Sequence, residues 1–462
     1  MIGAIDIAIV GLYLALVLGV GLWSGRHQGT LEEYAVVKRS FGSLVIFATM
    51  AASFIGGGFS MGIAERVFVF GIASVIALWG FSLKEILVAT VIAPRMGRFP
   101  GAISVGDIMA TTYGKPGRIV TGLFGMILCA GIVGAQVGAI GYVFNVFLGL
   151  DQLWGIAIGC GIVIAYTTLS GMRGVVITDL FQFAILSIGI PLTLIFGIIH
   201  IGGFDALAAA HPLDRLEIPG PHYTWLGLIT LFLVFALGET LVPPYLQRLC
   251  LSRDPKRAAR GTLFSGLFSI PFFAIAGAIG LVALAIDPTL DGNLSLPHVA
   301  VTVLPPVVKG LVVAAVIAIV MSSADSFLNS AAIAFVNDIV RPLRPVPLGE
   351  AAGLRLARIA TLVIGLASVG FAISIASILD ILIYAYTYWA PVVLVPLVAT
   401  ILGWRKGPAA FLVAAGAGLA CAIVWNDVLG QPAAVEGIII GVLANLICFT
   451  VMPRARPVPA EA

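Results

Sequence analysis

The sequence predicts an all-α polytopic membrane protein. Of its 462 residues, 60% are hydrophobic and only 10% are charged, and the mean hydropathy is +1.12. Soluble domains carry about 25% charged residues. A soluble globular fold is therefore excluded, and the apolar residues recur along the chain in runs of membrane-spanning length.

Thirteen apolar runs approach the length of about 20 residues that a helix needs to cross a bilayer. These predicted transmembrane helices cover residues 5–23, 44–65, 72–92, 119–147, 154–169, 175–201, 223–242, 261–286, 307–338, 354–376, 381–403, 409–425 and 434–451. Of the 25 Lys and Arg residues, 21 lie in alternate connecting segments, three lie in the others, and Lys84 lies inside a helix. Because cytoplasmic loops accumulate Lys and Arg, we expect the N-terminus outside and the C-terminus inside.

Several functional classes have no support in the sequence. The net charge of +3 is too small to predict a nucleic-acid partner, and the five cysteines lie in or beside apolar runs without metal-binding spacing. The chain has no Walker loop, no HExxH or GxSxG motif and no Cys/His cluster. We therefore expect no enzyme, no ATP-driven pump and no organic cofactor.

Two predicted helices contain helix breakers within the membrane. The second has three consecutive glycines at positions 56–58, each costing about 1 kcal/mol relative to alanine, although close helix packing is the alternative explanation. In the seventh, Glu239 precedes Pro243 and Pro244, which either interrupt the helix or end it. These helices are five apart, so they cross the membrane in opposite senses. Interrupted helices at matching positions of two inverted halves indicate the central site of a transporter.

The ninth predicted helix carries a dense polar face. Ser322, Ser326 and Ser330 recur every four residues, and Ser323 and Asp325 flank them. Such a face is expensive in lipid unless it faces protein or water. Hydroxyl and carbonyl oxygens suit an alkali cation, whereas hydrogen bonds to the same or a neighbouring helix are the alternative.

Other polar and aromatic residues in the apolar runs leave two explanations open. Asp179 either complements the dipole of the helix that starts near it or takes part in ion binding. We expect Lys84 and Glu85 to form a structural pair rather than to take part in transport. We expect four aromatic residues of the eleventh helix to lie in the aromatic belt at the membrane surface; the alternative is that they line a substrate pocket. They are Tyr384, Tyr386, Tyr388 and Trp389.

The sequence resembles the sodium/solute symporter family over nearly its whole length. The matching stretches are residues 30–34, 51–62, 166–171, 178–182, 245–248 and 321–326. The resemblance implies the five-plus-five inverted-repeat fold first seen in the leucine transporter. It divides the chain into a peripheral helix with its loop (1–43), a repeat of helices 2–6 (44–222), an inverted repeat of helices 7–11 (223–403), and two peripheral helices with a short tail (404–462).

The resemblance also implies a sodium site between helices 2 and 9, built from backbone carbonyls and serine hydroxyls. Carried over by position, its ligands are Ala52, Ile55, Ile319, Ser322 and Ser323. The residues expected at an accessory ion site are Asp179, Asp325 and Ser326. Sodium, as the co-transported ion, is the only metal expected.

The predicted solute pocket lies where the two interrupted helices meet helix 4 and the aromatic residues of helix 11. Its residues are Phe54, Gly56, Gly57, Gly58, Phe59, Gln136, Glu239 and Val242. The helix 2 segment is most similar to the choline-transporter branch, whose aromatic cage holds a quaternary ammonium group. Of the three positions aligned with the cage tryptophans, Phe54 is aromatic, whereas Cys129 and Val242 are not.

These features predict a sodium-coupled secondary active symporter that imports a small organic solute, such as an amino acid, another zwitterion or a monocarboxylate, by alternating access. Its expected partners are that solute and the lipid bilayer, in the inner (plasma) membrane of a bacterium. The alternatives are a passive facilitator or channel, and a proton-coupled carrier that uses Asp179, Glu239 or Asp325. Flux through a facilitator is indifferent to sodium, and a proton-coupled carrier depends on pH.

Overall fold

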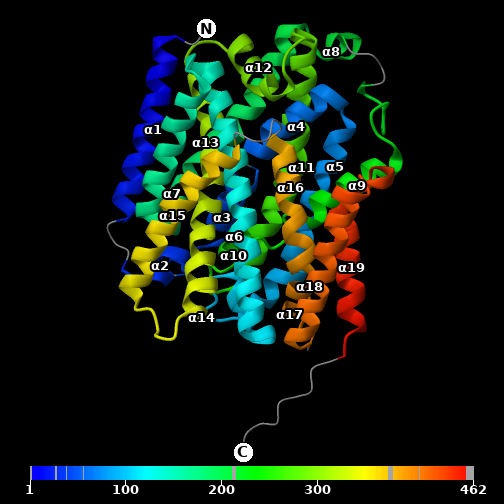
Figure 1. The fold of residues 1–462 in the computed structure, drawn as a ribbon. Coiled ribbons are helices and arrows are strands. Elements are labelled where there is room, and N and C mark those ends of the chain that lie inside the picture. Colours follow the sequence, from blue (N-terminus) through cyan, green and yellow to red (C-terminus); the bar gives the residue numbers. More distant parts are fainter. Residues whose placement is uncertain are drawn as a thin grey trace, which may run out of the picture.

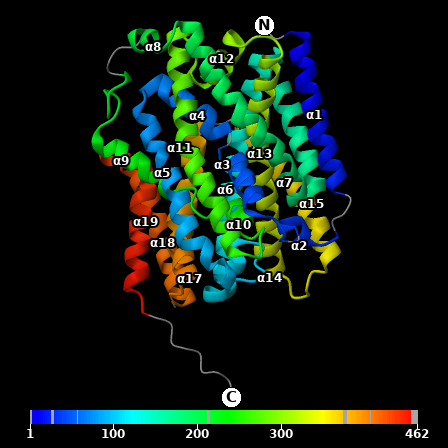
Figure 2. The same cartoon turned by 180° about the vertical axis from the view of Figure 1, so that it is seen from behind.

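The computed structural model describes residues 3–25, 29–37, 39–55, 57–210, 215–372, 378–404 and 406–453. In this part of the chain the long helices run along a common direction and form one bundle (Figures 1 and 2). Helix α1 (Ala4–Ser24) begins at one end of the bundle, and α19 (Gly437–Val451) finishes at the opposite end (Figure 1).

The remaining helices follow in chain order. The first half contains α2 (Leu31–Val36), α3 (Ser43–Phe54), α4 (Gly57–Phe70), α5 (Ala73–Leu87), α6 (Val105–Leu148), α7 (Gln152–Ile201) and α8 (Phe204–Ala210). The second half contains α9 (Trp225–Leu237), α10 (Pro243–Leu249), α11 (Pro255–Ile286), α12 (Ser295–Val303), α13 (Val308–Ile333), α14 (Arg341–Leu343), α15 (Glu350–Ala372), α16 (Ile378–Trp389), α17 (Val395–Leu402) and α18 (Pro408–Ile423). Four π-helical segments extend α5, α13, α16 and α18, namely η2 (Val88–Ile92), η6 (Ala334–Val340), η7 (Ala390–Leu394) and η8 (Val424–Val428).

The helices have the length and the exposed surface of an integral membrane protein. Among the described residues, nine are long and apolar enough to cross a membrane, and the bent pair α3–α4 makes ten if it forms one span. Two apolar helices, α9 and α19, are shorter. Large apolar side chains such as Leu12, Ile188 and Leu366 are about 60% exposed, and so much apolar surface on a bundle requires lipid around it.

One predicted boundary differs from the structure and one predicted gap coincides with a helix break, and both places have a glycine with positive φ. Helix α6 begins at Val105 rather than at 119, and its first turns carry charged residues that hydropathy excludes. It is broken at Gly114, which has φ 61°. The predicted helices 154–169 and 175–201 are the two parts of α7, which is broken at Gly171 with φ 50°. A side chain at Gly171 would also collide with the ring of Tyr34, 2.5 Å from a built Cβ.

Helix α13 forms the centre of the bundle. Every residue from Val312 to Ile333 is buried, although this stretch includes six polar residues that water would otherwise solvate. The helix packs against α6, α7, α3 and α4. Short helices close the ends: α8 and α12 lie at the end where α1 begins, and α2 and α14 lie toward the other (Figure 1).

Candidate functional site

Both helix breaks that the sequence predicts are present. Helix α3 ends at Phe54, and the axis from Phe59 onward is bent by 47° from that of α3. Helix α9 ends at Leu237, and α10 begins only at Pro243. Between them Leu241 has φ 55°, which ends any helical continuation. The proline at the start of α10 costs no hydrogen bond, because the first helical N–H groups have no partner in the helix.

Oxygen atoms from α3 and α13 converge beside the first break. The Ser322 hydroxyl lies 2.7 Å from the carbonyl oxygen of Ala52 and 3.0 Å from that of Ile319, and donates to either. The Ser323 hydroxyl donates to the carbonyl of Ser53 at 2.7 Å. Neutral oxygens grouped in this way form the type of ligand set that an alkali cation takes.

The structure therefore brings together only some of the five predicted sodium ligands. Three of them, from Ala52, Ile319 and Ser322, meet at the Ser322 hydroxyl. The fourth, Ser323, is bonded to the neighbouring carbonyl on α3. The carbonyl of the fifth, Ile55, instead accepts a hydrogen bond of 2.8 Å from the Ser60 hydroxyl across the break.

The serine face of α13 contacts both broken helices, in agreement with its four-residue spacing. Ser322 bonds to α3, as described above. Ser326 accepts a hydrogen bond from Arg248 of α10 at 2.6 Å, and Ser330 donates to Gln247 of α10 at 2.5 Å. A single helical face thus connects the two breaks.

Asp179 of α7 forms a fully buried ion pair with Arg248. The Nη2 atom of Arg248 lies 3.2 Å from Oδ2 of Asp179, and neither side chain is exposed. The same carboxylate oxygen accepts hydrogen bonds from the hydroxyls of Thr49 and Ser53. Asp179 lies eight residues beyond the break at Gly171, so the ion pair replaces the predicted alternative of a carboxylate that only complements a helix dipole.

The three residues predicted for an accessory ion site belong to this network. Ser326 donates to Oδ1 of Asp325 at 3.0 Å, and Tyr166 donates to Oδ2 at 2.6 Å. The hydroxyls of Ser326 and Ser53 are 3.0 Å apart, and Ser53 also bonds to Asp179. Arg248 also interacts electrostatically with Asp325, so two buried carboxylates share one guanidinium group, which is a net deficit of one positive charge when both are ionised.

Arg248 is the main residue that sequence analysis misses. The tally of basic residues places it among the cytoplasmic ones, and the structure corrects this, because α10 turns its side chain into the protein. Its Nε and Nη1 atoms donate to the carbonyls of Thr49 and Pro244 at 3.2 and 3.1 Å. The sequence feature that could have identified Arg248 is its place in the stretch 245–248, which resembles the symporter family.

The predicted solute-binding residues at the first break differ in their contacts. Phe54 ends α3 and packs against Tyr245 of α10, with ring centroids 5.2 Å apart. Phe59 belongs to an aromatic cluster, and its ring lies 5.2 Å from that of Phe81. Gly57 and Gly58 begin α4, whereas Gly56 lies outside the described residues.

The remaining predicted solute-binding residues are buried. Val242 precedes α10 and is fully buried. Gln136 of α6 is 2% exposed and Glu239 is 3% exposed. The Oε1 atom of Gln136 and the Oε2 atom of Glu239 have no hydrogen-bond partner among the described residues. An unpaired buried polar atom is costly, so these two atoms are candidates for contact with a ligand.

Lys84 and Glu85 form the structural pair that the sequence favours, and they do so between the two breaks. The Lys84 ammonium lies 2.9 Å from Oε1 of Glu85, and the two side chains are 2% and 0% exposed. The ammonium also lies 3.8 Å from the ring centroid of Phe81, 4.6 Å from that of Tyr245 and 5.8 Å from that of Phe54. Phe54 and Tyr245 belong to the two broken helices.

The predicted aromatic belt is wrong for two of its four residues. Tyr386 and Trp389 are fully buried, and the Trp389 indole N–H donates to the carbonyl of Thr240 at 3.2 Å, beside the second break. A carbonyl released from a helix in apolar surroundings needs such a donor. Tyr388 is half-buried, and the side chain of Tyr384 lies outside the described ones.

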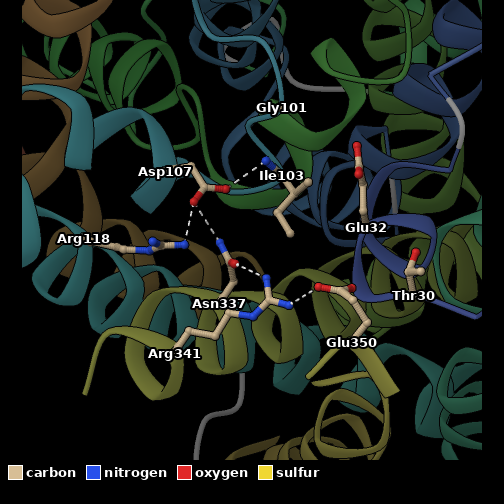
Figure 3. A pocket seen from close by; sticks show the side chains of 9 residues that line it. All are labelled: Thr30, Glu32, Gly101, Ile103, Asp107, Arg118, Asn337, Arg341 and Glu350. Atoms are coloured by element: carbon tan, nitrogen blue, oxygen red, sulfur yellow. Dashed lines mark hydrogen bonds and ion pairs between the residues drawn. The ribbon is translucent and has the colours of Figure 1, made fainter. Parts of the chain in front are cut away.

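A polar cavity of about 400 Å³ lies near the end of the bundle that holds α2 and α14. Asp107 accepts hydrogen bonds from Arg118 at 2.6 Å and from Asn337 at 3.1 Å, while Arg341 donates to Asn337 at 3.2 Å and to Glu350 at 2.8 Å (Figure 3). These contacts connect α6, η6, α14 and α15. Sequence analysis treats the basic members only as loop charges. The lining residues are Thr30, Glu32, Gly101, Ile103, Asp107, Arg118, Asn337, Arg341 and Glu350.

Comparisons with known proteins agree with this architecture. The model of the sodium:solute symporter family matches residues 34–410. The solved structure of a Na⁺-coupled sialic acid symporter in a substrate-bound outward-open state superposes with a TM-score of 0.85 at 20% identity, covering 99% of each chain. This likeness establishes the fold.

Two curated relatives have similar sequences. The high-affinity choline transporter 1 of Drosophila melanogaster is 28% identical over 401 residues, and the human sodium/iodide cotransporter is 26% identical over 372 residues. These matches cover 82% and 74% of this chain but only 64% and 56% of the relatives' own lengths. Because the family model covers more than three quarters of the sequence, the chain belongs to the sodium:solute symporter family.

Proposed function

We propose that this protein is a sodium-coupled symporter that imports a small organic solute by alternating access. The observation that carries the proposal is the meeting of the Ser322 hydroxyl with the carbonyls of Ala52 and Ile319 beside a broken transmembrane helix. These oxygens are neutral and suit a weakly bound alkali cation. Membership of the family supports the same assignment.

In the proposed mechanism, sodium binds to α3 and α13 together and thereby stabilises the conformation that binds solute. Its ligands are the carbonyls of Ala52, Ile55 and Ile319 and the hydroxyls of Ser322 and Ser323. The Ile55 carbonyl accepts a hydrogen bond from Ser60, and its second lone pair is available for the ion. Because coupling is reciprocal, the solute raises the affinity for sodium by the same factor that sodium raises the affinity for solute.

The ion gradient is sufficient for import. One charge moving through a potential of about 100 mV releases roughly 2.3 kcal/mol, and a tenfold concentration gradient adds about 1.4 kcal/mol. One sodium ion per cycle therefore supports accumulation of the solute by several hundred-fold. The second ion site proposed at Asp179, Asp325 and Ser326 is not required for import.

The proposed topology has thirteen membrane spans. Helix α7 counts as two, because its 50 residues would extend about 75 Å against a bilayer core of about 30 Å. The bent pair α3–α4 counts as one, and the shorter helices α9 and α19 as one each. An odd number of spans is supported by α1 beginning and α19 finishing at opposite ends of the bundle (Figure 1). The distribution of basic residues then puts the N-terminus outside.

The proposed division of the chain keeps the boundaries expected from the sequence. Residues 44–222 and 223–403 form the two inverted repeats, with 1–43 and 404–462 at the periphery. The division is supported by the two breaks, because one lies in the first helix of each proposed repeat. The solute pocket is proposed between these breaks, as in other transporters with inverted repeats.

Uptake by the purified protein in proteoliposomes tests the function. We expect an inward sodium gradient to drive accumulation of a small solute and an equal potassium gradient to fail. Ser368→Ala, which removes a hydroxyl that among the described residues bonds only to the carbonyl of Ile364 in its own helix, should transport like the unmodified protein. Equal solute flux in sodium and potassium would reject symport in favour of a facilitator.

A proton-coupled carrier is the second candidate. Buried Asp325, which is bonded to Tyr166 and Ser326, favours it, because a membrane carboxylate can carry a proton. This candidate predicts uptake driven by a pH gradient in sodium-free buffer. Uptake that follows the sodium gradient at constant pH would exclude it.

A further inference from the structure

The aromatic groups between the two helix breaks already surround a cation that belongs to the protein. Lys84 lies over the rings of Phe81, Tyr245 and Phe54, at 3.8, 4.6 and 5.8 Å from their centroids. It is also bonded to Glu85 at 2.9 Å. A quaternary ammonium ligand is recognised by such a group of rings. To use these rings it would have to displace a buried, paired ammonium group.

The charges around Lys84 do not balance. The ammonium interacts electrostatically with Glu239 as well as with Glu85, so two carboxylates share one positive charge. Glu239 is 3% exposed and Glu85 is fully buried. The Oε2 atom of each makes no hydrogen bond of good geometry among the described residues, although the Tyr386 hydroxyl lies beside Glu239 and the hydroxyls of Tyr245 and Ser265 lie beside Glu85. Because a buried carboxylate without a matching cation is costly, two carboxylates beside one ammonium group favour one further positively charged hydrogen-bond donor at this place.

The backbone beside Glu239 also favours a positively charged ligand. Glu239 lies two residues after the last residue of α9, so it is close to the negative end of that helix's dipole. The nearby carbonyls of Ala236 and Thr240 accept hydrogen bonds from Thr240 Oγ1 at 2.7 Å and from Trp389 at 3.2 Å. These bonds satisfy two carbonyls at the second break, whereas the Oε2 atom of Glu239 accepts no hydrogen bond of good geometry from the described residues.

On the basis of the symport function above, we propose that the transported solute carries a protonated amine with at least one N–H group and that Glu239 binds this group. Charge-assisted hydrogen bonds from such an amine would satisfy Glu239. A quaternary ammonium group has no N–H to donate, and the rings that would hold it are filled by Lys84. A plain monocarboxylate would add a second unpaired negative charge near Glu239.

Matched pairs of solutes that differ in N-methylation test this inference. The pairs are glycine and glycine betaine, proline and proline betaine, and ethanolamine and choline, with propionate as the monocarboxylate. Binding is read from the thermal stability of the purified full-length protein, in sodium and in potassium, because a ligand of the native state raises stability. We expect at least one amine to bind at least tenfold more tightly than its fully methylated partner, and propionate to have no effect.

Variants of Glu239 connect the preference to this residue. Glu239→Gln should weaken amine binding tenfold or more, and Glu239→Asp should retain part of it, because the charge is kept on a shorter side chain. The control is Glu217→Gln, which changes an exposed carboxylate in the segment before α9. If Glu239→Gln does not fold, the inference is still tested by Glu239→Asp and by the methylated solutes on the unmodified protein.

Three results would overturn the inference: equal binding of a quaternary compound and its amine partner, a response only to propionate or to none of these solutes, or unchanged amine binding by Glu239→Gln. The two proposals fail separately. Sodium-dependent binding of a quaternary compound would keep symport and reject the amine. An amine preference that is equal in sodium and potassium would keep this inference and reject sodium coupling.

Discussion

Arg248 and Asp179 form a fully buried ion pair, with Nη2 of the arginine 3.2 Å from Oδ2 of the aspartate. The guanidinium also donates to the carbonyl of Thr49 and to the hydroxyl of Ser326. One side chain from α10 therefore contacts α3, α7 and α13, which also contribute the oxygens of the proposed ion sites. The pair connects the second helix break to the first.

Removing Arg248 should strongly destabilise the protein. In Arg248→Met the Asp179 carboxylate stays buried without its cation, which costs about 3–5 kcal/mol. The double variant Asp179→Asn plus Arg248→Met should recover a large part of this loss. Heating the purified protein in detergent and measuring the fraction that stays monodisperse checks both effects.

Arg257→Met is the matched control for that experiment. Arg257 pairs with Asp254, but the two side chains are 58% and 48% exposed, so its loss should cost at most about 1 kcal/mol. If Arg248→Met were as stable as Arg257→Met, the buried pair would not hold these helices together.

The hydrogen bond between Trp389 and Thr240 should stabilise the second break. Trp389→Phe keeps an aromatic ring but leaves a buried carbonyl without a donor, at a cost of about 1–3 kcal/mol. Trp425→Phe removes a similar bond of 2.8 Å to Val435 near the end of α18, away from both breaks. We expect solute uptake to fall in Trp389→Phe and to persist in Trp425→Phe. Equal uptake by both variants would contradict a role of the break in transport.

Close packing of α5 on α9 should depend on Gly80. A Cβ at this position would lie 2.1 Å from the carbonyl oxygen of Phe232, so Gly80→Ala must push the two helices apart. Gly138→Ala is the control, because a Cβ there meets no atom within 4 Å and helix propensity improves by about 1 kcal/mol. The expected outcome is a loss of folded Gly80→Ala in detergent and no loss of Gly138→Ala. Equal yields would show that α5 and α9 can separate.

The ionic network near α14 should have one strong and one weak contact. Asp338 is 1% exposed and accepts a hydrogen bond of 2.6 Å from Ser104, so Asp338→Ala, which leaves this buried hydroxyl without its acceptor, should cost about 1–3 kcal/mol. Glu350 pairs with Arg341, but its side chain is 54% exposed, so Glu350→Gln should cost at most about 1 kcal/mol. The thermal stability of the two variants, compared side by side, checks the order. The reverse order would contradict it.

The sequence predicts the features that depend on hydropathy and on helix breakers. The apolar runs predict the helices, because a spanning segment must be long and apolar. The glycines at 56–58 and the Pro243-Pro244 pair predict the two breaks, because neither continues a regular helix. The spacing of Ser322, Ser326 and Ser330 predicts their common face, because residues four apart lie on one side of a helix.

The features that the sequence does not predict depend on tertiary contacts. Arg248 follows a helix and precedes other basic residues, so only the direction of α10 distinguishes it from a loop charge. From the sequence, Trp389 is the kind of residue expected at a membrane surface. Its burial is explained by its hydrogen bond to the carbonyl of Thr240, which the helix break exposes. The gap between the predicted helices 154–169 and 175–201 contains the break at Gly171, but the contact of this glycine with the ring of Tyr34, more than 130 residues away in the sequence, depends on the fold.

The proposed sodium site is tested most directly by equilibrium binding of ²²Na⁺ to the purified protein and to the double variant Ser322→Ala plus Ser323→Ala, with Ser368→Ala as control. The double variant loses both hydroxyl ligands, so we expect its sodium affinity to fall tenfold or more, and that of the control to stay unchanged. If the double variant bound sodium as tightly as the unmodified protein, the proposed sodium site would be wrong.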